Sequence, residues 1–297
     1  MTAAFADRLV ENVKRAGSPL CVGFDVFPER IPKLFGDATT DIRAVLRFGE
    51  AFIELAGPRA GVFKPQLGLF EQYGADGYLA AGVLSEMAQT AGMISLLDAK
   101  RGDIGTTAEG YARATIGAAP GFNADCVTVN PYLGRDSIEP FMKVAEANAK
   151  GVCVLVRTSN PGARDLQDQP VNGEPLWTRT ADMVLPFVER LMGDSGWSGL
   201  MVVCGATYPA EAAKLRAILP RALFLVPGYG AQGGTATDAV AGFTRTGTGR
   251  AGGVVSASRS VLYPQAAHAD VALEDWRGAI IAALEKHAGE LRAACNS

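Results

Sequence analysis

Eight short apolar segments recur along the chain, and helical patterns separate most of them. Each segment is bounded by glycine, proline or charged residues, which is typical of buried strands in a parallel sheet. Eight such units without a long linker favour a closed (β/α)8 barrel over a doubly wound sheet. We therefore expect residues 1–297 to form a single TIM barrel domain of the α/β class. The predicted strands cover residues 19–24, 60–65, 94–100, 125–130, 151–157, 199–204, 222–226 and 252–256.

An amphipathic helix is predicted before the first strand, because Phe5, Leu9 and Val13 recur at helical spacing among charged residues. This pattern is not that of a signal peptide, and no run approaches the roughly 18 apolar residues of a membrane span. We therefore expect a cytoplasmic protein. The turn-rich segment 163–174 is interpreted as an inserted loop. Further helices are predicted at about residues 41–56, 79–87, 136–148, 177–191, 209–218 and 271–284.

Charge and composition narrow the function classes. With a net charge of -3 and a pI near 5.6, the chain lacks the excess of positive charge that attracts nucleic acid. A small molecule is therefore the expected partner. Both histidines, His268 and His287, fall far from the predicted strand ends, which argues against histidine catalysis or a histidine metal site. The five cysteines are expected to be free thiols, and most of them lie in apolar strands: Cys21, Cys126, Cys153, Cys204 and Cys295.

Charged residues stand at the ends of several predicted strands. Asp98 and Lys100 are two residues apart, so they share a face of the third strand, and Gly102 allows a turn that brings Asp103 toward them. The spacing Asp-x-Lys-x-x-Asp alone also fits a surface ion-pair array. However, TIM barrels place their active sites at the C-terminal ends of strands. We therefore predict a site that contains five such residues: Asp25, Lys64, Asp98, Lys100 and Asp103.

A glycine-rich turn follows the seventh strand over residues 227–234, and the run 258–260 (Ser-Arg-Ser) follows the eighth. TIM barrels commonly bind phosphate here, and backbone N–H groups and a guanidinium suit a dianion. Gly228, Gly230 and Gly233 also match the dinucleotide-binding fingerprint. That fingerprint belongs after the first strand of a βαβ unit, with an acidic residue about 20 positions later. We therefore predict a phosphorylated ligand and not a dinucleotide.

Together, the strand with Lys64, the run Asp98-Ala-Lys100-Arg-Gly-Asp103, the glycine-rich turn and Arg259 resemble the orotidine 5'-phosphate decarboxylase family, in its longer-chain branch. The resemblance extends over about residues 19–263. It implies a catalytic tetrad of Lys64, Asp98, Lys100 and Asp103. It also implies that the following residues bind substrate: Asp25 at the ribose, Thr107 at the ribose or phosphate across a homodimer, Ser159 at the pyrimidine, and Gln232, Gly233 and Arg259 at the phosphate.

Two residues fit the resemblance less closely. Ser258 stands where many shorter members of the family have glycine, and a side chain there affects how closely the backbone can approach the phosphate. Ser159 is followed by Asn-Pro-Gly, an ordinary turn signal, so a simple turn is an equally good interpretation of that segment.

The activity that the resemblance implies is decarboxylation of orotidine 5'-phosphate to uridine 5'-phosphate in de novo pyrimidine biosynthesis. Lys100 would stabilise the carbanion at C6 and then protonate it, and neither a metal nor an organic cofactor is expected. One alternative is a Mg2+-dependent decarboxylase or aldolase of keto-sugar phosphates from the same superfamily. The lysine at position 64 disfavours it, because an ammonium repels Mg2+. A second alternative is a non-catalytic sensor of a nucleotide phosphate.

Overall fold

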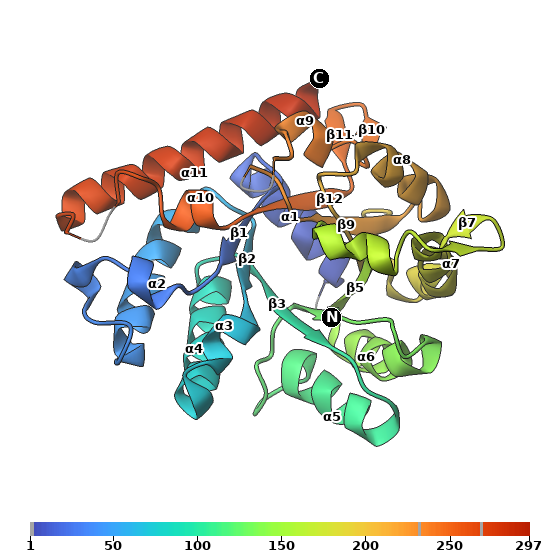
Figure 1. The fold of residues 1–297 in the computed structure, drawn as a ribbon, viewed down its shortest axis with the longest axis horizontal. Coiled ribbons are helices and arrows are strands. Elements are labelled where there is room, and N and C mark those ends of the chain that lie inside the picture. The colour runs from blue at the N-terminus through green and yellow to red at the C-terminus, as the bar shows by residue number, and fades with distance from the viewer. Residues whose placement is uncertain (1–2, 231–232, 268–269) are drawn as a thin grey trace.

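Eight parallel strands close into a barrel in the computed structural model, which describes residues 3–230, 233–267 and 270–297 (Figure 1). Around the barrel the strands are hydrogen-bonded in the order β1, β12, β9, β8, β5, β4, β3, β2. This confirms the predicted TIM barrel. The barrel strands are β1 (Leu20–Phe24), β2 (Val62–Pro65), β3 (Ile94–Arg101), β4 (Cys126–Val129), β5 (Gly151–Arg157), β8 (Ser198–Cys204), β9 (Ala222–Val226) and β12 (Gly253–Ala257).

Helices form the outer layer of the barrel (Figure 1). The longer ones are α1 (Phe5–Ala16), α2 (Ile42–Ala56), α4 (Gly74–Thr90), α5 (Gly105–Ile116), α6 (Arg135–Asn148), α7 (Leu176–Val188), α8 (Pro209–Ile218) and α11 (Leu273–Asn296). The short elements are the helices α3 (Leu67–Glu71), α9 (Ala236–Ala239) and α10 (Arg259–Leu262), the hairpin β6 (Pro170–Val171) and β7 (Glu174–Pro175), and the hairpin β10 (Thr244–Thr246) and β11 (Gly249–Ala251).

Three segments differ from the expected pattern. Helix α5 was not predicted, because it packs on the barrel mainly through small residues such as Ala108 and Ala112 and so lacks a strong apolar stripe. Between β9 and β12, the short helix α9 and the hairpin β10–β11 stand in place of a full-length helix. The segment 163–174, interpreted as a loop, contributes to the hairpin β6–β7.

The two faces of each barrel strand pack against different partners. In β1, Val22 and Phe24 point outward to the helices, and the Phe24 ring lies 5.6 Å from that of Phe48 on α2. Cys21 points inward, to a second apolar cluster inside the barrel. Both faces are therefore buried, which explains why the strands are nearly continuous apolar runs.

Helix α1 closes the N-terminal end of the barrel. Phe5 and Leu9 are buried in the inner apolar cluster, together with Cys21, Cys126 and Cys153 from the strands. Gly151, at the start of β5, leaves room for the Phe5 ring, because a Cβ there would lie 2.6 Å from it. The barrel therefore has a packed floor beneath its C-terminal mouth.

All five cysteines are free, as predicted. Among the residues that the structure describes, no helix is both long enough and apolar enough to cross a membrane.

Candidate active site

Strand periodicity places polar side chains inside the mouth of the barrel. Successive residues of a strand alternate between its faces, so the residues two and four positions after an inward-facing core residue also face inward. In β2 this series runs from Val62 through Lys64 to Gln66. The same series in the other strands gives pocket-lining residues that include Asp25, Asp98, Lys100, Thr128, Asn130, Leu155, Val203, Leu225, Ser256 and Ser258.

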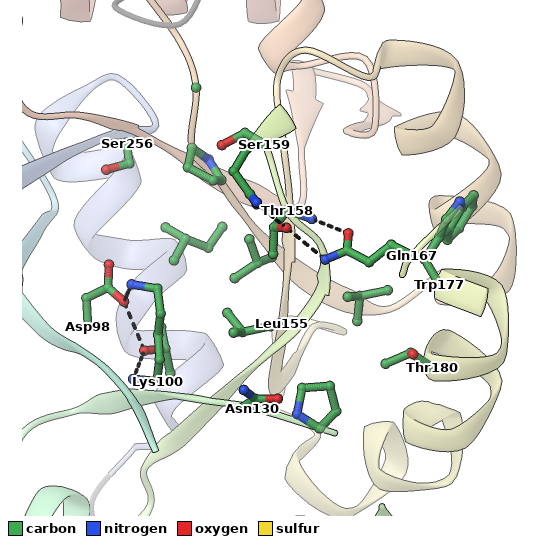
Figure 2. A pocket seen from close by; sticks show the side chains of 18 of the residues that line it. Asp98, Lys100, Asn130, Leu155, Thr158, Ser159, Gln167, Trp177, Thr180 and Ser256 are labelled. Atoms are coloured by element: carbon green, nitrogen blue, oxygen red, sulfur yellow. Dashed lines mark hydrogen bonds and ion pairs between the residues drawn. The ribbon is translucent and has the colours of Figure 1, made fainter. Parts of the chain in front are cut away.

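These residues line a cavity of about 930 Å3 at the C-terminal ends of the strands. Its two sides differ in polarity. The charged residues Lys64, Asp98 and Lys100 come from β2 and β3, and the apolar residues Val203 and Leu225 come from β8 and β9 across the barrel. Figure 2 shows Asp98 and Lys100 on one side of the view, Trp177 on the other, and Leu155 between them. Such a cavity suits a ligand that is partly apolar and carries charge near one edge.

Asp98 is the centre of the charged side. Its Oδ2 accepts hydrogen bonds from Lys64 Nζ at 2.9 Å and from Gln66 Nε2 at 3.0 Å. Its Oδ1 accepts from Lys100 Nζ at 2.5 Å and from Thr128 Oγ1 at 3.0 Å. Four donors from three strand ends therefore fix this carboxylate, and they hold two ammonium groups on either side of it.

The charges in this cluster hold one another in their ionised forms. Burial alone would raise the pKa of the Asp98 carboxyl, but Lys64 and Lys100 outweigh that effect and hold this pKa well below its usual range. Burial alone would lower the pKa of the Lys64 ammonium, but the carboxylates of Asp98 and Asp25 outweigh it and raise that pKa. Lys64 and Asp98 are therefore both charged at neutral pH although they are buried.

The backbone at Lys100 adopts an unusual conformation. Its φ is +49°, in the left-handed region, and the register between β3 and β4 shifts between Leu97 and Arg101. Lys100 N–H donates to Thr128 Oγ1 at 2.8 Å, and that hydroxyl in turn donates to Asp98. Asp98 and Lys100 do meet, as strand alternation predicts, but an irregular backbone at Lys100 and a threonine from β4 also help to place the lysine.

Asp25 follows β1 and lines the same cavity. Its Oδ1 is buried and has no hydrogen-bond partner among the residues that the structure describes. Burying a carboxylate oxygen without a donor is unfavourable. A ligand hydroxyl that donates to Asp25 would remove this penalty.

The turn after β12 reaches the cavity through Ser258 and Arg259. Ser258 packs directly over Gly23 of β1, where a Cβ would lie 2.0 Å from the serine Oγ. The glycine on the neighbouring strand thus makes room for the serine side chain. Arg259 is exposed and forms no ion pair with any residue in the described ranges. Within those ranges its guanidinium is therefore free to bind a ligand anion.

The glycine-rich turn after β9 contributes Pro227, Gly228 and Tyr229 to the lining of the cavity. Gly233 is exposed and lies outside this lining, and its N–H donates to Gly230 O at 2.9 Å. Gln232, like His268, lies outside the described residues.

Ser159 lines the cavity directly after β5, at the border with the inserted segment. Gln167 of that segment accepts from Thr158 N–H at 2.9 Å and donates to Thr158 Oγ1 at 2.8 Å (Figure 2). The insertion is thereby tied to the residue that precedes Ser159. It extends the cavity with Leu166 and Gln167, and Trp177 of α7 continues the lining.

Asp103 and Thr107 do not line the cavity of their own chain. Asp103 forms no ion pair within the described ranges, and its Oδ1 accepts from the N–H of Ile104 at 2.8 Å. Thr107 is exposed on the first turn of α5. The turn at Gly102 therefore does not bring Asp103 to Lys100 within one chain.

Among the polar residues that line the cavity and were missing from the prediction are Gln66, Thr128 and Asn130. Each belongs to an inward-facing series, so the signal was their even spacing from Val62 and Cys126 in the sequence. The strand-end residues that the sequence pattern predicts are all charged, whereas these three are neutral.

Comparisons with known proteins agree with this geometry. Residues 18–272 match the sequence profile of the "Orotidine 5'-phosphate decarboxylase / HUMPS family". The chain is 39% identical over 269 residues to orotidine 5'-phosphate decarboxylase of Rhodopirellula baltica, covering 87% of this chain and 88% of the relative. It is 42% identical over 247 residues to the enzyme of Azoarcus sp., covering 83% and 85%. The solved structure of Leishmania donovani OMP decarboxylase is similar, with a TM-score of 0.78, 30% identity and 99% coverage of both chains.

Proposed function

Because the chain belongs to the orotidine 5'-phosphate decarboxylase / HUMPS family, we propose that its cavity converts orotidine 5'-phosphate into uridine 5'-phosphate and carbon dioxide, a step of pyrimidine biosynthesis. One observation carries the assignment of the chemistry. Lys64 and Lys100 flank the Asp98 carboxylate on the side of the cavity that faces an apolar wall. A pyrimidine ring suits the apolar wall, and its C6 edge can then face the ammonium groups.

Lys100 has the central role in this mechanism. When the bond from C6 to the carboxylate breaks, the electron pair stays on C6 in the plane of the ring, where the ring cannot delocalise it. A cation held beside C6 stabilises this charge, and Lys100 then delivers a proton to C6. The contact with Asp98 orients the ammonium, so little rearrangement is needed as charge develops.

The other residues support the reaction in different ways. Asp98 lies where it would repel the substrate carboxylate, and this repulsion disappears as carbon dioxide leaves. Asp25 would accept from a ribose hydroxyl through its unpaired Oδ1. Ser159 would contact and recognise the pyrimidine. Arg259, with Gln232 and Gly233 of the glycine-rich turn, would hold the phosphate, as the family resemblance implies.

The rival within the family is a Mg2+-dependent reaction of keto-sugar phosphates. Mg2+ needs oxygen ligands that converge on it. Beside Asp98 stands the Lys64 ammonium at 2.9 Å, where a second carboxylate ligand would be required. A non-catalytic sensor is also a weaker proposal, since a binding protein gains nothing from placing a carboxylate next to an anionic ligand.

A spectrophotometric assay tests the proposal. The purified protein is mixed with orotidine 5'-phosphate, and the loss of pyrimidine absorbance is followed with and without EDTA. We expect the same rate in both samples. Loss of activity in EDTA and recovery with Mg2+ would favour the keto-sugar reaction, and ligand binding without turnover would favour the sensor.

We also propose that the protein is a homodimer in which Asp103 and Thr107 reach the active site of the partner subunit. Exposed apolar residues beside Asp103 support this arrangement: Ile104, Tyr132 and Leu133. Tyr132 is 77% exposed, and its loop adjoins the turn at Gly102 through the hydrogen bond from Asn130 N to Arg101 O at 2.8 Å. Burial of these side chains between two subunits would remove apolar surface from water.

Mixing two inactive variants tests the shared site. In a two-fold dimer, a heterodimer of Asp103→Ala and Lys100→Ala chains has one doubly damaged site and one intact site. With random exchange, half of the dimers are mixed, so about a quarter of wild-type activity should return. If mixtures shown to contain heterodimers are no more active than the parent variants, Asp103 serves its own barrel.

We also propose that the enzyme works in the cytoplasm. The five free cysteines suit a reducing compartment. Detection of the protein mainly outside the cytoplasm after cell fractionation would contradict this placement.

A further inference from the structure

The side chain of Tyr229 attaches the turn after β9 to the C-terminal helix α11. Pro227 and Tyr229 are the only non-glycine residues among the described members of the turn. Gly228 and Gly230 flank Tyr229 with φ of +93° and +72°, conformations that other residues rarely adopt. Tyr229 is 5% exposed, and its side chain packs against α11, far along the sequence.

Two residues of α11 bind the Tyr229 hydroxyl. His287 Nδ1 lies 3.0 Å from Tyr229 Oη, and Glu290 Oε2 accepts a hydrogen bond from the same hydroxyl. A phenol has one proton to donate and a carboxylate can only accept, so Tyr229 donates to Glu290. His287 must then donate its Nδ1–H to the phenol oxygen, which fixes its tautomer.

This contact corrects the expectation that His287 has no relation to the strand ends. His287 is buried on α11, yet its ring packs edge-on against the Tyr229 ring, with centroids 5.4 Å apart. Helix α11 also packs against α9, which follows the same turn (Figure 1). The C-terminal helix therefore supports the turn at two neighbouring points.

We propose that Tyr229, held by His287 and Glu290, is a positioning residue for phosphate binding. It fixes the described part of the glycine-rich turn so that Gly228 presents its polar backbone groups to the phosphate of the substrate. Glycine-rich backbone is otherwise conformationally free, and ordering it on binding would weaken affinity. This inference rests on the proposed function, in which the turn and Arg259 bind the phosphate.

The variant Tyr229→Phe tests the proposal, because it keeps the ring and removes both hydrogen bonds. Calorimetry would measure the binding of uridine 5'-phosphate and of uridine. We expect the variant to bind the nucleotide about tenfold more weakly and uridine within about twofold of wild type. The KM for orotidine 5'-phosphate should rise in parallel. His287→Leu should behave in the same way, whereas His287→Gln, whose amide can still donate to the phenol, should retain most of the affinity.

Two further variants serve as controls. Tyr73→Phe removes another partly buried tyrosine hydrogen bond, which Tyr73 Oη donates to Ala38 O at 2.7 Å outside the cavity, and should change neither affinity. Arg259→Ala should abolish most of the preference for the nucleotide over uridine, because it removes a charge-assisted contact.

The outcomes separate the two proposals. If the wild-type protein binds uridine as tightly as the nucleotide, the proposed phosphate site is wrong and the role of Tyr229 falls with it. If Arg259→Ala loses the preference but Tyr229→Phe and His287→Leu keep it, only the role of Tyr229 is overturned. Equal losses for both ligands in Tyr229→Phe would show a general structural role, which also overturns the inference.

Discussion

Two buried aspartates lie at opposite ends of the barrel and have similar surroundings. Asp98, at the C-terminal end, is 7% exposed and binds two lysines. Asp125, immediately before β4 at the N-terminal end, is 4% exposed and binds Arg8 at 2.5 Å, with Lys150 at 3.7 Å. Burial and charge pairing alone therefore do not distinguish a catalytic carboxylate from a structural one.

The difference lies in the partners of each carboxylate. Asp125 also accepts from the backbone N–H of Ser95 and from Gln89, both at 3.0 Å, so it joins α1, β3 and α4. Asp98 instead holds Lys100, whose side chain is 46% exposed and lines the cavity. A carboxylate whose partners belong to the packed framework holds the fold together, and one whose partners face a cavity prepares them for a ligand.

The largest effect is expected at Lys100. Lys100→Ala should lower turnover at least about a thousandfold, or ~4 kcal/mol, because the lysine acts on charge that develops in the transition state. Binding of uridine 5'-phosphate should persist, as calorimetry would show. Turnover within about tenfold of wild type would show that the partners of Asp98 are not catalytic.

Asp125→Asn should have the reverse pattern. It removes the negative charge that compensates Arg8 and Lys150, so the free energy of unfolding should fall by about 3 kcal/mol. Turnover of the folded variant should stay within about twofold of wild type. Urea denaturation and the absorbance assay measure the two quantities, with Asp98→Asn as the matched variant. Greater loss of turnover in Asp125→Asn than in Asp98→Asn would contradict the distinction.

Lowering the pH provides a further test of the ion pairs of Asp98, because acid protonates carboxylates. Because the ion pairs lower the pKa of Asp98, its stabilising contribution is present above the ordinary aspartate pKa of about 4 and is lost as the pH falls further. The difference in unfolding free energy between wild type and Asp98→Asn should therefore shrink from pH 6 to pH 3, as measured by urea denaturation. A constant difference would mean that the pairs with Lys64 and Lys100 do not stabilise the fold.

The smallest expected effect concerns His287, a buried histidine of α11 at the side of the barrel, and the pH dependence of stability. Burial lowers the pKa of His287. The charge of Lys286 lowers this pKa further, and the charge of Glu290 raises it. The hydroxyl of Tyr229 also faces the His287 ring. The unfolded chain then binds a proton more readily, so stability should fall as the pH drops below about 6.5, by at most ~1.4 kcal/mol per pH unit. Denaturation at pH 7.5 and 5.5 should show a smaller fall for His287→Gln. Equal falls would exclude His287 as the cause.

Much of this architecture could be predicted from local sequence patterns. The barrel strands are short apolar runs, and the pairing of Asp98 with Lys100 follows from their spacing. The left-handed backbone at Lys100 could not be foreseen, since it depends on Thr128 from a neighbouring strand. The contact between Tyr229 and His287 could not be predicted from the sequence either. These residues are 58 positions apart and meet only through the packing of α11.

The packed floor of the barrel also limits the route by which small molecules can enter and leave the cavity. Phe5 and Leu9 of α1, together with the inner layer of strand residues, block the barrel axis beneath the charged cluster. Carbon dioxide formed in the cavity must therefore leave toward the mouth through which the nucleotide entered. The two products of the reaction therefore share the exit at the mouth, because the other end of the pocket is closed by the packed inner cluster.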